Sequence, residues 1–86
     1  MATPRIDERF HPQLTKLGLK VAYYRGLAGL TQDELAEKIG VSRNTLSNIE
    51  RTGIIVGLSL NTIFCISEAL DTPVRDLFDF RDSKNE

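Results

Sequence analysis

The chain has 86 residues, of which 41% are hydrophobic and 27% charged, and this balance is ordinary for one globular domain. It has no apolar run near the roughly 20 residues of a membrane span, and its N-terminus lacks the apolar stretch of a signal peptide, so we expect a cytoplasmic protein. One cysteine, Cys65, and one histidine, His11, exclude an internal disulfide framework and leave little for a metal site, a cofactor or catalysis.

The net charge of −1 does not by itself indicate a nucleic-acid-binding domain, for which a basic surface is expected. The charges are, however, unevenly distributed. Residues 14–53 carry six basic and four acidic side chains, whereas residues 54–86 carry three basic and six acidic ones. Because local potential attracts phosphates more than net charge does, the middle of the chain remains compatible with DNA binding.

The first 12 residues are predicted to form a flexible arm, because Pro4 and Pro12 oppose regular structure. A first helix is predicted from about residue 13 to 27, with Gly26 and Gly29 ending it. Apolar residues at spacings of three and four give this helix one buried face. These residues are Leu14, Leu17, Val21 and Tyr24.

A second helix is predicted to begin at Thr31, where the order Thr-Gln-Asp-Glu is a capping box that joins Thr31 to Glu34. Gly40 ends this helix, because glycine readily adopts the left-handed conformation of a helix end. Ser42 then caps a third helix that runs to about residue 51. Leu35, Ala36, Ile39, Leu46 and Ile49 are predicted to face inward from these two helices.

Two shorter helices are predicted to follow. Ser59 caps the fourth helix. Its inward face is expected to contain Leu60, Ile63, Ile66 and Leu70. The fifth helix is predicted to start at Thr72 and Pro73, since threonine suits a cap and proline the first helical position. Leu77 and Phe78 are expected to close the core, and residues 83–86 to fray.

The second and third helices are spaced as in a helix-turn-helix, two helices joined at a steep angle by a short turn. Ala36 is small where the third helix passes close to the second. Gly40 supplies the turn, and Leu46 reaches back into the angle between the helices. The sequence therefore has all the features of this motif: the capping residues, the small residue, the glycine and the apolar positions.

The stretch TQDELAEKIGVSRNTLSNIE, residues 31–50, resembles the lambda-repressor-like family of DNA-binding proteins, also called the Cro/repressor or XRE type. The resemblance extends over residues 17–78. It implies an all-α, five-helix domain, here residues 13–82, whose third helix enters the major groove of double-stranded DNA. It also implies binding as a dimer to a two-fold site.

The resemblance implies a role for individual residues. Gln32 matches a glutamine that contacts a phosphate and braces the recognition helix. Exposed recognition positions are matched by Ser42, Arg43, Asn44, Ser47 and Asn48, and Arg51 follows them at the end of that helix. Arginine can bond guanine and asparagine can bond adenine bidentately. The alternative for these residues is an ordinary solvated helix face.

Arg25 and Glu50 match a family pair that bridges the first and third helices, so we expect a structural ion pair, since a planar guanidinium fits a carboxylate. Arg25 could instead lie free on the first helix and contact a phosphate.

The sequence departs from the family pattern at residues 52–58, which are apolar and uncharged where a polar or basic loop is usual. Two interpretations remain open: a loop folded over the core, or a dimer contact, in which Phe64 and Phe80 could take part. The residues concerned are Ile54, Ile55, Val56 and Leu58.

The favoured function is a sequence-specific transcriptional regulator, a repressor that acts as a homodimer and has no domain for a small-molecule ligand. The alternative is a protein–protein module, such as the antitoxin of a toxin–antitoxin pair, because the chain is acidic towards its end and has an apolar loop. An enzyme is not expected.

Overall fold

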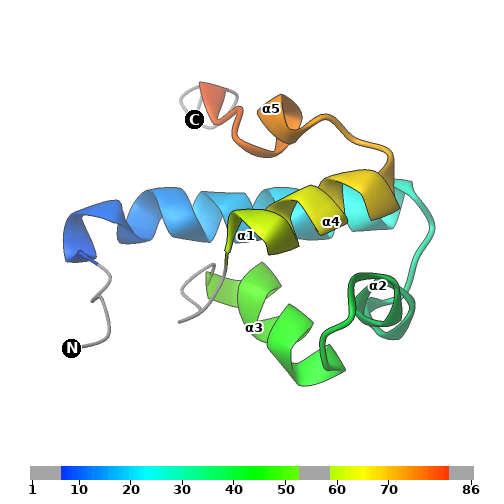
Figure 1. Cartoon of the computed structure of the whole chain (residues 1–86). Coiled ribbons are helices and arrows are strands. Elements are labelled where there is room, and N and C mark those ends of the chain that lie inside the picture. Colours follow the sequence, from blue (N-terminus) through cyan, green and yellow to red (C-terminus); the bar gives the residue numbers. More distant parts are fainter. Residues whose placement is uncertain (1–6, 53–58, 82–86) are drawn as a thin grey trace.

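The computed structural model describes residues 7–52 and 59–81, and every regular element within these ranges is helical. A short 3-10 helix, η1 (Glu8–Phe10), precedes α1 (His11–Leu27), α2 (Gln32–Ile39), α3 (Arg43–Thr52), α4 (Leu60–Leu70) and α5 (Val74–Leu77). The predicted all-α, five-helix fold is thus confirmed. Figure 1 shows α1 as the long central helix, with α2 and α3 on one side of it and α5 on the other. No helix in the described residues is long and apolar enough to span a bilayer.

The predicted flexible arm is wrong for residues 7–12, which are helical or cap a helix. Asp7 caps η1 by accepting a hydrogen bond from the amide of Arg9 at 2.9 Å. Pro12 does not delay α1, because it occupies the first turn, where a missing N–H leaves no hydrogen bond unmade. Residues 1–6 of that arm and the tail at 83–86 lie outside the described ranges.

The end of α1 is set by one of the two predicted glycines. Gly29 has a φ of 75°, the left-handed conformation that glycine adopts without strain. Gly26 instead lies inside the last turn of the helix, so its predicted role as a terminator was wrong.

The start of α2 and the turn between α2 and α3 both have the predicted local chemistry. The Thr31 hydroxyl accepts from the Glu34 amide at 3.0 Å, while the Glu34 carboxylate accepts from the Thr31 amide at 2.8 Å. Gly40 has a φ of 77°, and Ser42 Oγ accepts from the Thr45 amide at 3.0 Å. Both helix boundaries next to the turn are therefore fixed by the residues predicted from sequence.

The core lies where α1, α2, α3 and α4 meet, and Leu77 of α5 completes it. Its most deeply buried side chains are Val21, Leu35, Leu46, Ile49, Ile66 and Leu77. Ala36 is 3% exposed where α2 packs against its neighbours, as expected for a position that requires a small residue. Burial of such apolar surface is the main term favouring the fold.

Three predictions for α4 and α5 were wrong. Leu60 is 70% exposed and Phe78 is 43% exposed, although both were assigned to the core. Thr72 does not cap α5: its hydroxyl donates to the carbonyl of Leu70 at 3.1 Å, and Pro73 is the N-cap. Helix α5 is therefore one residue shorter at its start, and only Leu77 anchors its end in the core.

Gly18 sets how closely α1 and α3 approach. It is buried in the middle of α1, and a Cβ atom placed there would lie 2.2 Å from the carbonyl oxygen of Ile49. No real Cβ atom tolerates that distance from a backbone atom. The third helix can therefore lie against the first only because this position lacks a side chain.

We expect Gly18→Ala to destabilise the protein by about 1–3 kcal/mol, because overpacking forces the backbones apart. Gly26→Ala is the matched control, since the same Cβ would meet nothing within 4 Å. That change should raise stability by about 0.5–1 kcal/mol through helix propensity. Urea unfolding of both variants tests this, and equal effects would contradict the close approach.

Candidate nucleic-acid interface

The predicted recognition residues lie on the side of α3 that faces away from the core. Leu46, Ile49 and Glu50 are buried, whereas the residues between them in the helical repeat are exposed or half-buried. Four of the predicted residues are exposed: Ser42, Arg43, Asn44 and Arg51. The other two, Ser47 and Asn48, are half-buried. The helix thus has an outward polar face of hydrogen-bonding side chains, which we call the α3 polar face: Arg43, Asn44, Ser47, Asn48 and Arg51.

Several of these side chains contact each other or their neighbours. Arg51 Nη2 donates to Asn48 Oδ1 at 2.6 Å. The Ser42 hydroxyl accepts from the Thr45 amide and donates to Thr45 Oγ1 at 2.9 Å, so its main role in this structure is the cap. Arg43 Nε lies 3.6 Å from a carboxylate oxygen of Asp33 on α2, a contact that was not predicted.

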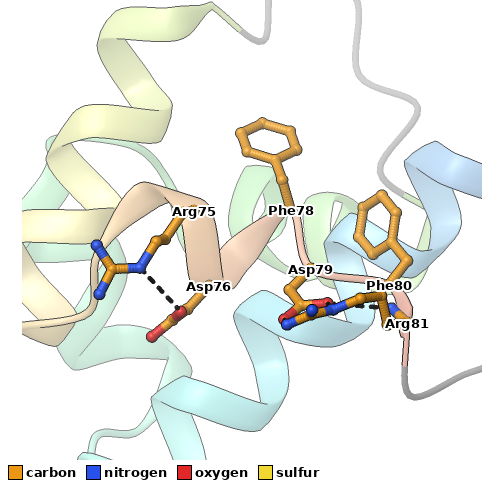
Figure 2. A pocket seen from close by; sticks show the side chains of 6 residues that line it. All are labelled: Arg75, Asp76, Phe78, Asp79, Phe80 and Arg81. Carbon is orange, nitrogen blue, oxygen red and sulfur yellow. Dashed lines mark hydrogen bonds and ion pairs between the residues drawn. The ribbon is translucent and has the colours of Figure 1, made fainter.

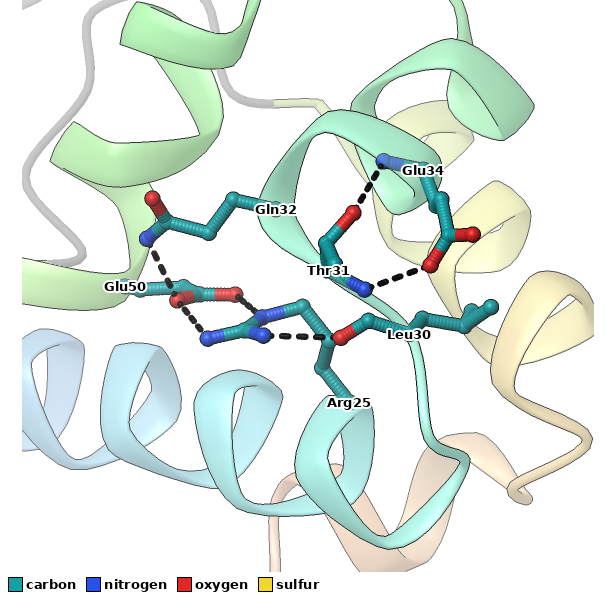
Figure 3. A network of polar contacts seen from close by, with 6 residues as sticks. All are labelled: Arg25, Leu30, Thr31, Gln32, Glu34 and Glu50. Atoms are coloured by element: carbon teal, nitrogen blue, oxygen red, sulfur yellow. Dashed lines mark hydrogen bonds and ion pairs between the residues drawn. The ribbon is translucent and has the colours of Figure 1, made fainter.

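Behind the α3 polar face, Arg25 and Glu50 form a bidentate ion pair (Figure 3). Arg25 Nε donates to Glu50 Oε2 at 2.6 Å, and Nη2 donates to Oε1 at 3.1 Å. The third guanidinium nitrogen, Nη1, donates to the carbonyl of Leu30 at 2.8 Å. The Glu50 side chain is 6% exposed and that of Arg25 21%. The hydrogen bond to Glu50 raises the pKa of Arg25, so this cation stays charged.

Gln32 joins the same network. Its Nε2 donates to Glu50 Oε1 at 3.0 Å, so Glu50 accepts from both α1 and α2 (Figure 3). An amide nitrogen carries two hydrogens, and this bond uses one of them. The other can still donate to a phosphate at the N-terminus of α2, where the helix dipole favours an anion. The structure thus gives Gln32 a bracing contact, and its phosphate contact stays a prediction.

The four predicted dimer residues, Ile54, Ile55, Val56 and Leu58, lie outside the described ranges. Beyond them, α4 exposes Leu60 and Phe64, the latter 58% exposed. After α5, Phe78 and Phe80 stack edge to face, with ring centroids 6.5 Å apart.

These two phenylalanines line a surface hollow together with two ion pairs, Arg75–Asp76 and Arg81–Asp79 (Figure 2). The hydrogen bond from Arg81 lowers the pKa of Asp79 to about 2. The charges around the hollow are therefore paired with one another, which gives no indication of a bound ion. Cys65 is half-buried on α4, and the described residues contain no cluster of three side chains that could hold a metal.

A family model described as helix-turn-helix matches residues 21–77 of the chain. An uncharacterised HTH-type transcriptional regulator from Methanocaldococcus jannaschii is 38% identical over 65 residues, which cover 76% of this chain and 96% of that protein.

Two solved proteins have a similar fold. The restriction-modification controller protein C.AhdI from Aeromonas hydrophila has a TM-score of 0.71 and 33% identity, over 78% of this chain and 98% of that one. SinR, a master regulator for biofilm formation, was solved in complex with DNA and has a TM-score of 0.65 and 36% identity, over 73% and 98%. SinR in its complex with SinI has a TM-score of 0.67 and 33% identity, and the match covers 81% of this chain and 66% of that one.

Replacing Glu50 with alanine should lower the free energy of unfolding by about 3 kcal/mol, because it leaves a partly buried guanidinium without its carboxylate. The double variant Arg25→Ala/Glu50→Ala should lose less than the sum of the two single variants, since no charge is stranded. Glu37→Ala, an exposed carboxylate on α2, is the control and should stay within about 0.5 kcal/mol of the parent. Thermal melts of Glu50→Ala and the parent that coincide would refute the bridging role.

Proposed function

Because the chain belongs to the lambda-repressor-like helix-turn-helix family of transcriptional regulators, which are DNA-binding proteins and not enzymes, we propose that it is a sequence-specific repressor. It binds as a homodimer to a two-fold operator in double-stranded DNA, in the cytoplasm. Repression is the simplest outcome, since a protein that occupies a site excludes polymerase from it. The observation that carries the proposal is the α3 polar face, exposed on a helix whose opposite face is locked into the core.

The chemistry of the α3 polar face suits the edges of base pairs in the major groove. A recognition helix contacts the bases with residues near its N-terminus, where Arg43 and Asn44 lie. An arginine fork matches O6 and N7 of guanine, and the asparagines match adenine. Gln32, the first residue of α2, would hold a phosphate, a contact that fixes the register of the protein on DNA without reading sequence.

A homodimer places two copies of α3 about 34 Å apart, one turn of B-DNA. We propose that Leu60 and Phe64, one helical turn apart on α4, contribute to this dimer together with the neighbouring residues 54–58. Large apolar side chains exposed side by side on one helix are typical of an interface. A two-fold axis would bring the same pair of residues together from both protomers.

A second candidate function is binding to a different protein, as in a toxin–antitoxin pair. SinR, which is similar to this chain, was solved in complex with the SinI protein as well as with DNA. The same exposed residues on α4 would then meet an unrelated chain. The oligomeric state of the purified protein distinguishes this candidate from the homodimer.

Arg43 and Gln32 should respond differently to substitution if one contacts bases and the other a phosphate. Arg43→Ala should cost roughly 1–3 kcal/mol on the cognate site and relax the preference at one base pair per half-site. Gln32→Ala should weaken binding by similar factors on all sites, with little change in the salt slope, because a neutral amide releases no counterion. Binding titrations against a panel of operators with single-base changes measure both effects. If Arg43→Ala lowered the affinity equally for every operator, Arg43 would contact the DNA backbone and not a base.

Phe64→Asp should give a folded monomer that binds the operator more weakly. Leu19→Asp is the matched control, because Leu19 is also 58% exposed but lies on α1. That variant should keep the parent's oligomeric state. Sedimentation equilibrium at high micromolar concentration provides the measurement. A parent protein that is monomeric both alone and on DNA would refute the homodimer.

A further inference from the structure

Asp33 and Arg43 connect the N-terminal ends of α2 and α3. Asp33 is in the first turn of α2, and Arg43 is the first residue of α3. An oxygen of the Asp33 carboxylate lies 3.6 Å from Arg43 Nε. The two residues are ten positions apart in the chain, and only the steep crossing of the two helices brings them together.

The carboxylate approaches one edge of the guanidinium most closely. The Arg43 guanidinium has three nitrogens, and the one nearest to Asp33 is Nε, which is also nearest the backbone. Among residues 7–52 and 59–81, Arg43 makes no hydrogen bond and no other ion pair. The two terminal nitrogens, Nη1 and Nη2, thus remain available as a pair of parallel donors. That pair is the part of the fork that can bond O6 and N7 of guanine end-on.

The pair contributes little to folding. At 3.6 Å the two atoms are beyond hydrogen-bond range, and the side chains are 76% and 63% exposed. Exposed ion pairs of this kind add little to the stability of the fold in water. In a groove from which water has been displaced, the same two charges attract more strongly, since the effective dielectric constant is lower. Asp33 should therefore influence Arg43 mainly when the protein is bound to DNA.

We infer that Asp33 is a specificity-determining residue, which holds Arg43 through Nε and presents its terminal nitrogens to a base pair. This inference rests on the proposed function. When Asp33 is present, rotation of the Arg43 side chain towards a phosphate would break the ion pair between them. A contact between Arg43 and a base is therefore favoured over a contact between Arg43 and the DNA backbone. Without Asp33, Arg43 is free to exchange one contact for the other, and the preference for one base weakens.

An ordinary role for Asp33 would be that of an acidic residue in a first turn, which favours the helix dipole. That role predicts a change in stability and no change in base preference. A role as a mere repellent of phosphates predicts that removing the charge raises affinity equally for every sequence. Base preference is therefore the measurement that separates these roles from positioning.

The test uses the whole chain and the duplex that it selects from random DNA, with every single base-pair change in one half-site. Asp33→Asn should lower the preference at the base pair that Arg43→Ala also affects, by about fivefold, and should leave the other positions unchanged. In an Arg43→Ala background, Asp33→Asn should change nothing beyond about twofold. Glu37→Gln removes the same charge from the same helix without a contact to Arg43, and should keep the parent's preference.

The outcomes distinguish this inference from the function on which it rests. If the parent selects no sequence, the proposed function fails and the positioning role fails with it. If the parent selects a site but Asp33→Asn keeps the full preference, only the positioning role is overturned. The positioning role is also overturned if Glu37→Gln lowers the base preference as Asp33→Asn does. It is overturned as well if Asp33→Asn still lowers the preference in the Arg43→Ala background.

Discussion

A carboxylate buried among three helices must be satisfied from several directions, and Glu50 is satisfied by a guanidinium of α1 and an amide of α2. Burying a charge is costly unless it is paired and hydrogen-bonded. The cost is offset here only when α3 has the correct rotation and position relative to both neighbours. The orientation of the α3 polar face therefore depends on a buried contact made by another residue of the same helix.

The features that could be predicted from sequence are those decided by neighbours in the chain. The capping box at Thr31, the left-handed turn at Gly40 and the cap at Ser42 each need residues within a few positions, and the structure has all of them. Apolar spacing likewise identified the buried side of α2 and α3. Periodicity was less informative at the ends of helices: Leu60 fits the pattern of α4, yet its side chain is 70% exposed.

The contacts between distant residues were harder to predict. The pairing of Arg25 with Glu50 was expected only through the family resemblance. Nothing local points Gln32 at Glu50 or Asp33 at Arg43, because both contacts arise from the crossing angle of packed helices. Gly18 did leave a signal. A glycine in the middle of a helix costs about 1 kcal/mol relative to alanine, so its presence calls for a close neighbour.

The separation of α3 into a buried and an outward side has a consequence for how such a domain changes over time. Its inner residues, Leu46, Ile49 and Glu50, are buried in the core, whereas the outward ones are exposed or half-buried. Substitutions on the outward side are thus nearly neutral for stability. The outward side chains can therefore be exchanged for others while the scaffold is kept. If Arg43 were grafted onto a related domain, Asp33 would have to be grafted with it to preserve the selectivity for one base pair.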